Sequence, residues 1–258
     1  MKPAASYGLL TLLLTLCFHI NSLRAQSTTL IKNSDSSKGI SQINPLIVHK
    51  CVDFTITGDG SDPQWNKSEW FNLTKLDTGG KNYISRFKIL YSPDGIYLLF
   101  NGEDEKIATK FDKDFESIFN GDVFEVFFHT DHAAPGYFEY EINALNKELV
   151  LVLSRANGKA YSWAPWHYEN ERSIKRLVNV VGGKAESGST ISSWTAELFF
   201  PYELLMLLPD VPPKSGTIWD ANFCRLDYDT DKMIKWSWSP TIKKSFHELD
   251  QFLQVKFE

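Results

Sequence analysis

Acidic and amide side chains recur at alternate positions in two strongly apolar segments. The stretch GDVFEVFFHTD places Glu125 within a run of bulky apolar residues, and YFEYEINAL carries Glu139, Glu141 and Asn143. Carboxylates and amides gathered on one surface can hydrogen-bond the hydroxyl groups of a sugar, while aromatic rings cover its apolar faces. Two carboxylates about 5–10 Å apart could instead hydrolyse a glycosidic bond.

Strands are the elements that must position these side chains. Successive side chains of a strand point to opposite faces of the sheet. If the two segments pair, one shared face carries these polar and aromatic residues: Glu125, Tyr137, Glu139, Glu141 and Asn143. The opposite face is apolar and is predicted to form the core. We therefore expect the acids to look outward, either as a sugar-binding patch or as an ordinary solvated face of an antiparallel sheet.

The tryptophans separate into two groups. Trp163 and Trp166, in YSWAPWHY, occupy a predicted Pro-containing loop, where aromatic residues are good ligand-binding candidates. The alternative is that this loop folds its rings down onto the protein. Four others lie in strand-like segments and are predicted to face the core: Trp194, Trp219, Trp236 and Trp238.

The N-terminus has the pattern of a secretory signal. Lys2 precedes an apolar run over residues 7–20, and a small residue marks a cleavage site after Ala25. We expect a secreted chain, in the periplasm or at the cell surface; a retained membrane anchor is the alternative. Nothing later approaches the roughly 20 apolar residues of a membrane span. Residues 26–45, rich in Ser and Asn, are predicted to be a flexible leader.

The charge balance limits the class of partner. Cleavage would remove Lys2 and Arg24 and leave 25 basic against 32 acidic residues, a net charge of −7. This acidity argues against nucleic acid or an anionic membrane as partner, because both need a basic surface. Cys51 and Cys224 could pair in an oxidising compartment or remain buried thiols.

The remaining chain, residues 46–258, reads as one all-β domain. Short β-like runs alternate with turn residues almost to the end, and SPDG joins RFKILY to IYLLF in a predicted hairpin. One helix is predicted at 201–208, beginning at Pro201 and ended by Pro209. These patterns predict an antiparallel β-sandwich with jelly-roll or immunoglobulin-like layers.

The order and spacing of several motifs resemble family 9 carbohydrate-binding modules. The resemblance runs from about residue 48 to residue 258. The segments that carry it are ITGDGSDPQW, SPDGIYLLFNGEDEKI, FNGDVFEVFFHTD with Asp122, Glu125 and Phe127, YFEYEINALNKE, WTAELFFPYELL, GTIWDANFCRLDY with Gly216, Trp219, Asn222 and Arg225, and the closing WSWSP and FHELDQFLQVKF.

The resemblance implies a β-sandwich that binds sugars, and it suggests positions for the site. Two tryptophans sandwich the sugar in such modules, and those positions are Phe119 and Phe246 here. The acidic partners fall at Asp104 and Glu125, and the amide at Asn143. A phenylalanine wall still stacks on a ring, with less area than tryptophan.

The function implied is non-catalytic binding of a poly- or oligosaccharide in carbohydrate catabolism. A glycoside hydrolase is a further expected partner, since such modules are often attached to or encoded beside these enzymes. At Glu141 an acid replaces a basic residue of the family pattern. No cofactor is expected; structural calcium, which occurs in this family, is the alternative.

Two other functions stay open on the sequence. A glycoside hydrolase acting on O-glycosyl bonds would use Glu125 with Glu139 or Glu141. A haem-binding sandwich of the dehydrogenase-subunit type would need axial ligands. The available ligands are Met206, Met233, His129, His167 and His247.

Overall fold

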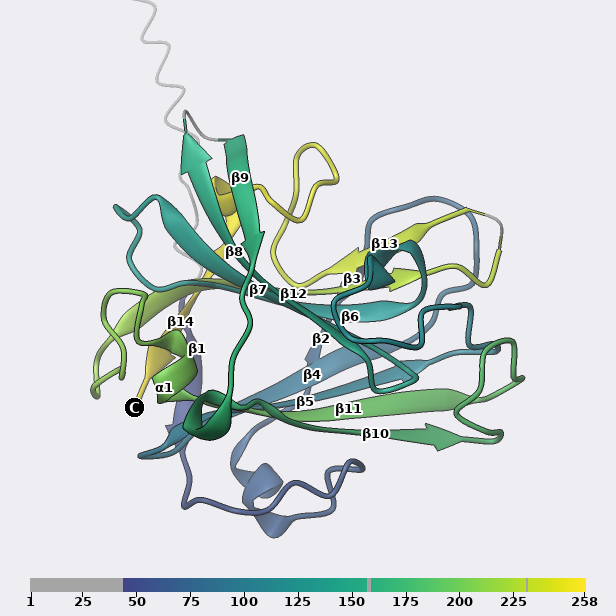
Figure 1. The fold of residues 1–258 in the computed structure, drawn as a ribbon, viewed down its shortest axis with the longest axis horizontal. Coiled ribbons are helices and arrows are strands. Elements are labelled where there is room, and N and C mark those ends of the chain that lie inside the picture. Colours follow the sequence, from purple (N-terminus) through teal and green to yellow (C-terminus); the bar gives the residue numbers. More distant parts are fainter. Residues whose placement is uncertain (1–43, 157–158, 231) are drawn as a thin grey trace, which may run out of the picture. The chain divides into compact units, whose positions relative to one another are not determined.

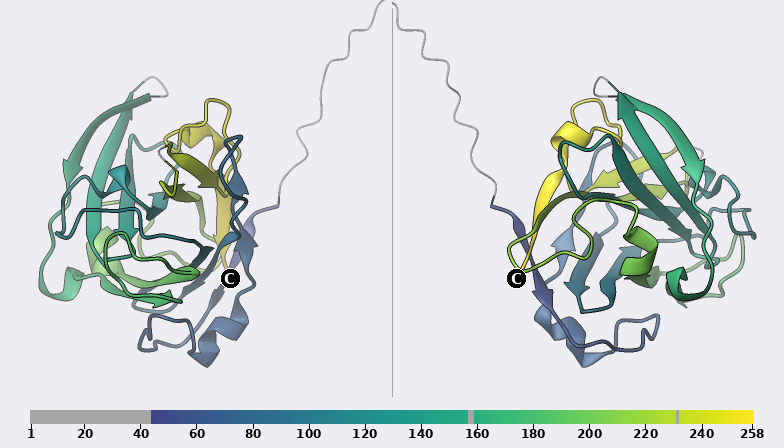
Figure 2. Two further views of the ribbon diagram at one scale, coloured as in Figure 1. Left: turned by 90° about the vertical axis from the view of Figure 1, so that its right-hand side faces the viewer. Right: turned by 60° about the vertical axis from the view of Figure 1, so that its left-hand side comes forward.

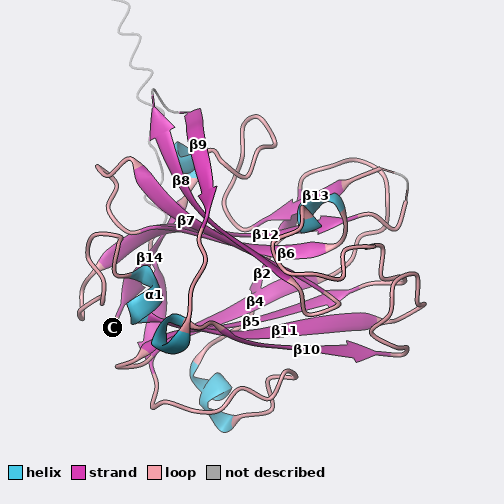
Figure 3. Ribbon diagram, viewed as in Figure 1, coloured by secondary structure: helices cyan, strands magenta, loops and turns pink. Residues whose placement is uncertain are grey.

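Two layers of strands, joined by one connecting strand, build the computed structural model (Figure 1). It describes residues 44–156, 159–230 and 232–258. The expected signal peptide and nearly all of the expected leader lie outside the described residues. The predicted all-β sandwich is confirmed: strands make up almost all the regular structure, and one short α-helix accompanies them (Figure 3).

The first layer is antiparallel throughout. The SPDG turn joins two of its central strands, as the sequence predicts. In spatial order its strands are β10 (Lys175–Val181), β11 (Ser193–Pro201), β5 (Gly95–Glu103), β4 (Ser85–Tyr91) and, beside β4, the short β2 (Phe71–Asn72).

The second layer carries the acids. Its main strands are, in order, β14 (Leu253–Phe257), β12 (Ile218–Asp227), β6 (Val123–His129), β7 (Gly136–Asn143), β8 (Glu148–Ala156) and β9 (Lys159–Pro165). Two short strands extend from β12: β13 (Ile234–Ser237) and β3 (Thr74–Lys75). Strand β1 (Leu46–Lys50) pairs in parallel with both β4 and β14 and so joins the layers.

The helical elements are all short. The helix α1 (Tyr202–Leu205) is shorter than the predicted 201–208, because Leu208 N donates to Leu205 O at 2.9 Å in a tight turn that ends it. Single 3₁₀ turns occur at η1 (Pro63–Lys67), η2 (Ile118–Asn120), η3 (Asn170–Arg172) and η4 (Leu249–Gln251). No described helix has the length and hydropathy that a membrane crossing requires.

The main core fills the space between the layers. Phe124, Val126 and Phe128 face it from β6, as their alternation predicts. Trp194, Trp219 and Trp236 are buried there, and Trp238 packs against them half-buried, so the strand tryptophans lie where the sequence predicts. Cys51 and Cys224 are buried and unpaired.

The GDGSDPQW motif wraps over the first layer and is held by one buried acid. Glu197 of β11 accepts hydrogen bonds from the backbone N–H groups of Gly58 and Gly60, at 2.6 and 3.2 Å. Its other oxygen accepts from Trp65 Nε1 at 2.7 Å. Gly60 has φ +71°, a backbone conformation that favours glycine, and a Cβ there would lie 2.3 Å from the end of the Leu99 side chain, so a larger residue would strain this turn and displace Leu99. This part of the family motif is structural.

Candidate functional site

Glu125, Glu139 and Glu141 share the face of β6 and β7 that points away from the main core. The alternation predicted this shared face, but the expectation that it is open to solvent is wrong. The three side chains are only 4%, 4% and 1% exposed. Segments just before β6 and β14 fold over this face and form a second apolar cluster with it, including Ile118 and Phe246.

The covering segments leave a pocket of about 570 Å³ above the three acids. The β8–β9 hairpin and the segment that leads into β14 lie at the same end of the layers (teal and yellow in Figure 2), and an ion pair between Arg155 and Asp250 joins them at 2.7 Å. The pocket is lined by the acids Glu125, Glu139 and Glu141, by the apolar Leu149, Leu151, Leu153, Pro165, Leu226 and Met233, by the aromatic Phe115, Phe119, Trp163 and Phe246, and by Glu116, Ser117, Lys235, Lys244, Ser245 and His247.

Strand register brings the acids together. Glu125 lies directly opposite Glu141 across the β6–β7 pair, and Glu139 is two residues before Glu141 on the same face. The carboxyl groups of Glu139 and Glu141 are near enough to influence each other's pKa. Two neighbouring carboxyl groups in a buried place favour a proton on one of them, because two like charges repel.

Burial raises the pKa of all three acids. Loss of hydration is the largest cause in each case, and it raises the pKa of Glu139 to about 7. The pKa values of Glu125 and Glu141 lie well above the usual range. Burial is the larger cause, and repulsion from the neighbouring acids adds to it. The positive charge of Lys235 acts in the opposite direction and lowers the pKa of Glu125.

The acids keep hydrogen-bonding capacity that the protein leaves unused. Glu139 Oε2 and Glu141 Oε2 are buried oxygens to which no described protein group donates a hydrogen bond. His247 lies near, with Nδ1 3.9 Å from Glu139 Oε2, but this nitrogen is 3.0 Å from Tyr137 Oη. Buried acceptors without a donor are rare in folded proteins and costly, so this end of the pocket favours a ligand that brings hydroxyl or amine donors.

The aromatic walls differ in exposure. Phe119 is 39% and Trp163 66% exposed, so both line the part of the pocket that solvent reaches. Phe246 also lines the pocket but is buried and packs edge-on against Phe127. Trp163 does not lie in a loop as predicted: it belongs to β9, where it pairs with Leu153 of β8.

Three of the residues singled out by sequence lie outside this pocket. Asn143 is committed to a turn: its Nδ2 donates to Phe111 O at 2.9 Å, and its Oδ1 accepts from the N–H groups of Leu145 and Lys147. Trp166 packs half-buried against the main core. The five that line the pocket are Phe119, Glu125, Glu141, Trp163 and Phe246.

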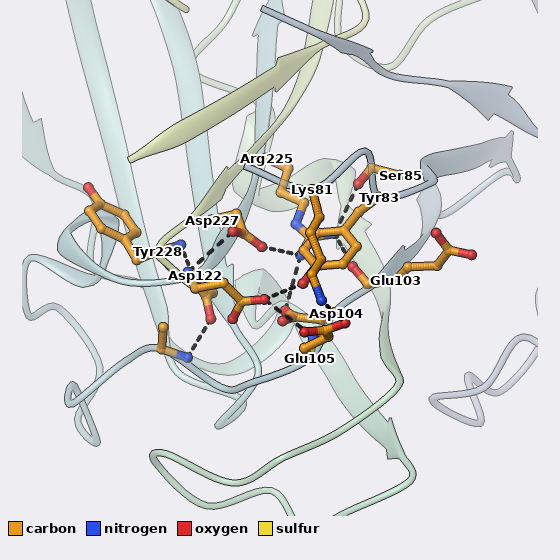
Figure 4. Close-up of polar contacts among 12 residues, drawn as sticks. Lys81, Tyr83, Ser85, Glu103, Asp104, Glu105, Asp122, Arg225, Asp227 and Tyr228 are labelled. Atoms are coloured by element: carbon orange, nitrogen blue, oxygen red, sulfur yellow. Dashed lines mark hydrogen bonds and ion pairs between the residues drawn. The ribbon is translucent and has the colours of Figure 1, made fainter. Parts of the chain in front are cut away.

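Asp104 belongs to a buried ion-pair network instead (Figure 4). Its Oδ2 is 3.1 Å from Arg225 Nη2, which also bonds Asp227 Oδ2 at 2.7 Å. Trp194 Nε1 donates to the same Asp104 oxygen. Burial raises the pKa of Asp104 to about 7, although the Arg225 guanidinium opposes the shift. The family-motif arginine therefore ties β12 to the first layer.

This network does not fit calcium. Carboxylate oxygens of Asp104, Asp227 and Asp229 lie within 4.8 Å of one another. Calcium needs six to eight oxygen ligands. Here the guanidinium of Arg225 already takes the cation's place between two of the three carboxylates.

The residues available for haem ligation are dispersed. Among the described residues only Met233 and His247 of that set line the pocket. Met206 is exposed on the surface, His129 is buried outside the pocket, and His167 packs at a tilt against Phe115. The acids below Met233 and His247 make a poor surface for an apolar macrocycle.

Several lining residues were not singled out from the sequence. ELVLVLS places Leu149, Leu151 and Leu153 on one face of β8, so strand periodicity could have found all three. Lys235 and His247 reach the pocket from β13 and the segment after it, and no local pattern marks them.

The chain resembles known proteins in sequence and fold. A family model described as carbohydrate-binding family 9 matches residues 64–257. A Bacteroides uniformis ATCC 8492 protein to which carbohydrate binding has been ascribed is 18% identical, with a TM-score of 0.67 over 83% of this chain and 99% of that one. No curated protein sequence matches.

Family 9 modules themselves share the fold. One from Caldicellulosiruptor kristjanssonii, solved with cellotriose, gives a TM-score of 0.58 at 12% identity, covering 83% of this chain and 94% of that chain. A structure of a module from the same organism with glucose gives 0.57 at 12% identity, covering 82% and 95%. Together with the family match, the fold and the motif order lead to one conclusion: the chain belongs to carbohydrate-binding family 9.

Proposed function

We propose that the pocket above Glu125, Glu139 and Glu141 binds an oligosaccharide or polysaccharide without catalysis. The observation that carries this proposal is a set of buried carboxyl groups with unpaired oxygens beneath aromatic and aliphatic walls. Sugar hydroxyls are donors that these oxygens lack, and the faces of Phe119 and Trp163 suit the apolar side of a pyranose ring.

Glucose and glucose-containing chains are the first ligands to test. The two Caldicellulosiruptor modules with the same fold were solved with cellotriose and glucose. In this chain the walls are Phe119, Trp163 and Phe246, and an acid, Glu141, stands where the family pattern has a basic residue. We therefore propose the same ligand class, with a preference that need not match those modules.

The arrangement of the acids supports binding over hydrolysis. A retaining hydrolase holds its two carboxyl groups about 5–5.5 Å apart, and an inverting one holds them farther apart. Glu125 lies directly opposite Glu141, and Glu139 shares their face of the sheet, so all three acids reach a ligand from the same side. Hydrolysis needs two carboxyl groups that flank the scissile bond.

We further propose that the mature chain acts outside the cytoplasm, in the periplasm or at the cell surface, in polysaccharide catabolism beside a glycoside hydrolase. The signal-like pattern ending near Ala25 supports this location.

Calorimetric titration of the purified chain with glucose, cellotriose and matched xylo- and manno-oligosaccharides tests the function. Trp163→Ala and Phe119→Ala are expected to weaken binding by about 0.5–1.5 kcal/mol, the value of aromatic stacking beyond its buried area, without unfolding the protein. Tyr161→Ala is the matched control, because Tyr161 is exposed on the same strand and does not line the pocket.

Binding that survives both wall substitutions unchanged would contradict the placement of the site. No binding across a broad glycan array would contradict the function itself, and a Soret absorption band would replace it with haem binding.

A further inference from the structure

A second group of side chains, away from the sugar pocket, combines two imidazoles and a carboxylate. His129 ends β6, Asp220 lies directly opposite it on β12, and His132 follows in the turn that leads to β7. One ligand atom from each lies within 4.8 Å of the other two. Asp220 Oδ2 is 2.8 Å from His132 Nδ1 and 3.8 Å from His129 Nδ1.

The hydrogen bond of His129 determines which of its nitrogens is free. Nε2 is 2.8 Å from the carbonyl oxygen of Ala134, so Nε2 carries the hydrogen and donates it. In the neutral ring Nδ1 then presents a lone pair. This nitrogen is fully buried and no described group hydrogen-bonds it. An unpaired nitrogen lone pair thus lies within 3.8 Å of the Asp220 carboxylate.

Two acceptors that face each other inside a protein repel unless a cation lies between them. A proton on Nδ1 would not remove this repulsion through a hydrogen bond, because Nδ1 and Asp220 Oδ2 are 3.8 Å apart. Among the described residues, Asp220 forms ion pairs only with these two histidines, so no lysine or arginine supplies the missing charge.

We propose that His129, His132 and Asp220 bind a divalent transition metal, with Zn²⁺ as the best match. Two imidazole nitrogens and one carboxylate form a ligand set that zinc uses, and the fourth position would take water. The ligand atoms around a tetrahedral zinc ion stand about 3.4 Å apart. The observed 2.8 and 3.8 Å lie on either side of that value.

The surroundings suit such an ion in two ways. Ala134 O holds the far nitrogen of His129, which is the outer hydrogen bond that orients a metal-binding histidine. The His132 side chain is 75% exposed, so it can rotate to improve the geometry and it leaves the fourth position open to water. A bound ion would fasten the β6–β7 turn to β12. Two nitrogen ligands disfavour calcium and magnesium.

Zinc titration of the metal-free chain at pH 7.5 tests this site. We expect one Zn²⁺ per chain, and Co²⁺ should give the visible absorption bands of a tetrahedral site. His132→Ala should weaken Zn²⁺ binding at least about tenfold, since even loss of an outer-shell partner costs that much. It should not unfold the protein, because this side chain is exposed.

His49→Ala is the matched control, as it removes an exposed histidine from β1 and should leave Zn²⁺ binding unchanged. Asp220→Asn should weaken binding as His132→Ala does. Absence of stoichiometric Zn²⁺ binding, equal binding by His132→Ala, or displacement of Zn²⁺ by equimolar Ca²⁺ would each overturn the proposal. The cluster would then be a simple His132–Asp220 ion pair.

Discussion

Glu197 in the first layer and the three glutamates beneath the pocket are equally buried but differently supported. Glu197 is fully buried and accepts hydrogen bonds from the N–H groups of Thr57, Gly58 and Gly60, from the Thr57 hydroxyl, and from Trp65 Nε1. In the pocket, by contrast, oxygens of the buried Glu139 and Glu141 receive no donor from the described chain.

The difference separates a structural acid from the acids of the proposed binding site. Donors around Glu197 replace the water that it loses on folding, so the carboxylate can hold a loop against the sheet. The pocket acids lose their water without that replacement, and burial raises their pKa values. Such a site is held by the rest of the fold at a cost in stability, which a ligand's donors can offset.

The largest effect should follow Glu197→Gln. The amide loses the negative charge and turns N–H groups toward backbone donors, so several charge-assisted hydrogen bonds are lost at once. We expect the free energy of unfolding to fall by about 3–5 kcal/mol in denaturant titrations. Sugar affinity of the folded fraction should not change. A loss below 1 kcal/mol would erase the contrast between the two regions.

Glu139 should make the protein less stable as the pH rises. Its pKa is raised from the usual 4.5 to about 7 in the folded chain, so between these values the folded state holds a proton that the unfolded state has lost. Stability therefore falls with increasing pH across this window, by up to about 3 kcal/mol for one such group.

Glu139→Gln should remove that part of the pH dependence. Denaturant titrations of both proteins between pH 4 and 8 measure it, and the variant should gain stability relative to the parent chain above pH 7. Parallel curves for the two proteins would show that Glu139 ionises as freely as an exposed acid.

Glu125→Gln should separate binding from stability. Loss of the hydrogen bond between this acid and the sugar is expected to weaken binding by about 1–3 kcal/mol in calorimetry. Stability should stay level or rise, because the substitution removes a poorly compensated buried acid. If binding is unchanged, Glu125 does not contact the ligand.

Glu148→Gln provides the opposite case to Glu125→Gln. Glu148 is buried outside the pocket and pairs with Arg176 at 2.6 Å, so its loss should lower stability and leave binding intact.

Strand periodicity predicted much of the fold and the shared face of the acids. Local patterns predicted three features: the pairing of β6 with β7, the hairpin of β4 and β5, and the inward tryptophans of β11, β12 and β13. Each depends on turn residues or on side-chain alternation over a few positions. Local pattern could not place Asp104 beside Arg225, because those residues are 121 positions apart in sequence. Local pattern also predicted a loop at Trp163, which lies in the edge strand β9. Pro165 is typical of a loop, and the strand buries neither face at residues 161–165, so its sequence lacks the alternation of a half-buried strand.

By itself, the sequence determined the family, the all-β class and which side chains share a face, because alternation along a strand depends only on backbone geometry. Tertiary structure alone decided that the acids lie under a pocket and not on an open patch. Phe246, which covers the acids, is distant in sequence from their strands, and Ile118 lies in a segment that folds back over β6. Only the packing of the assembled protein brings both segments over the acids. It also decided which acids receive donors, because burial and hydrogen bonding are properties of the assembled layers.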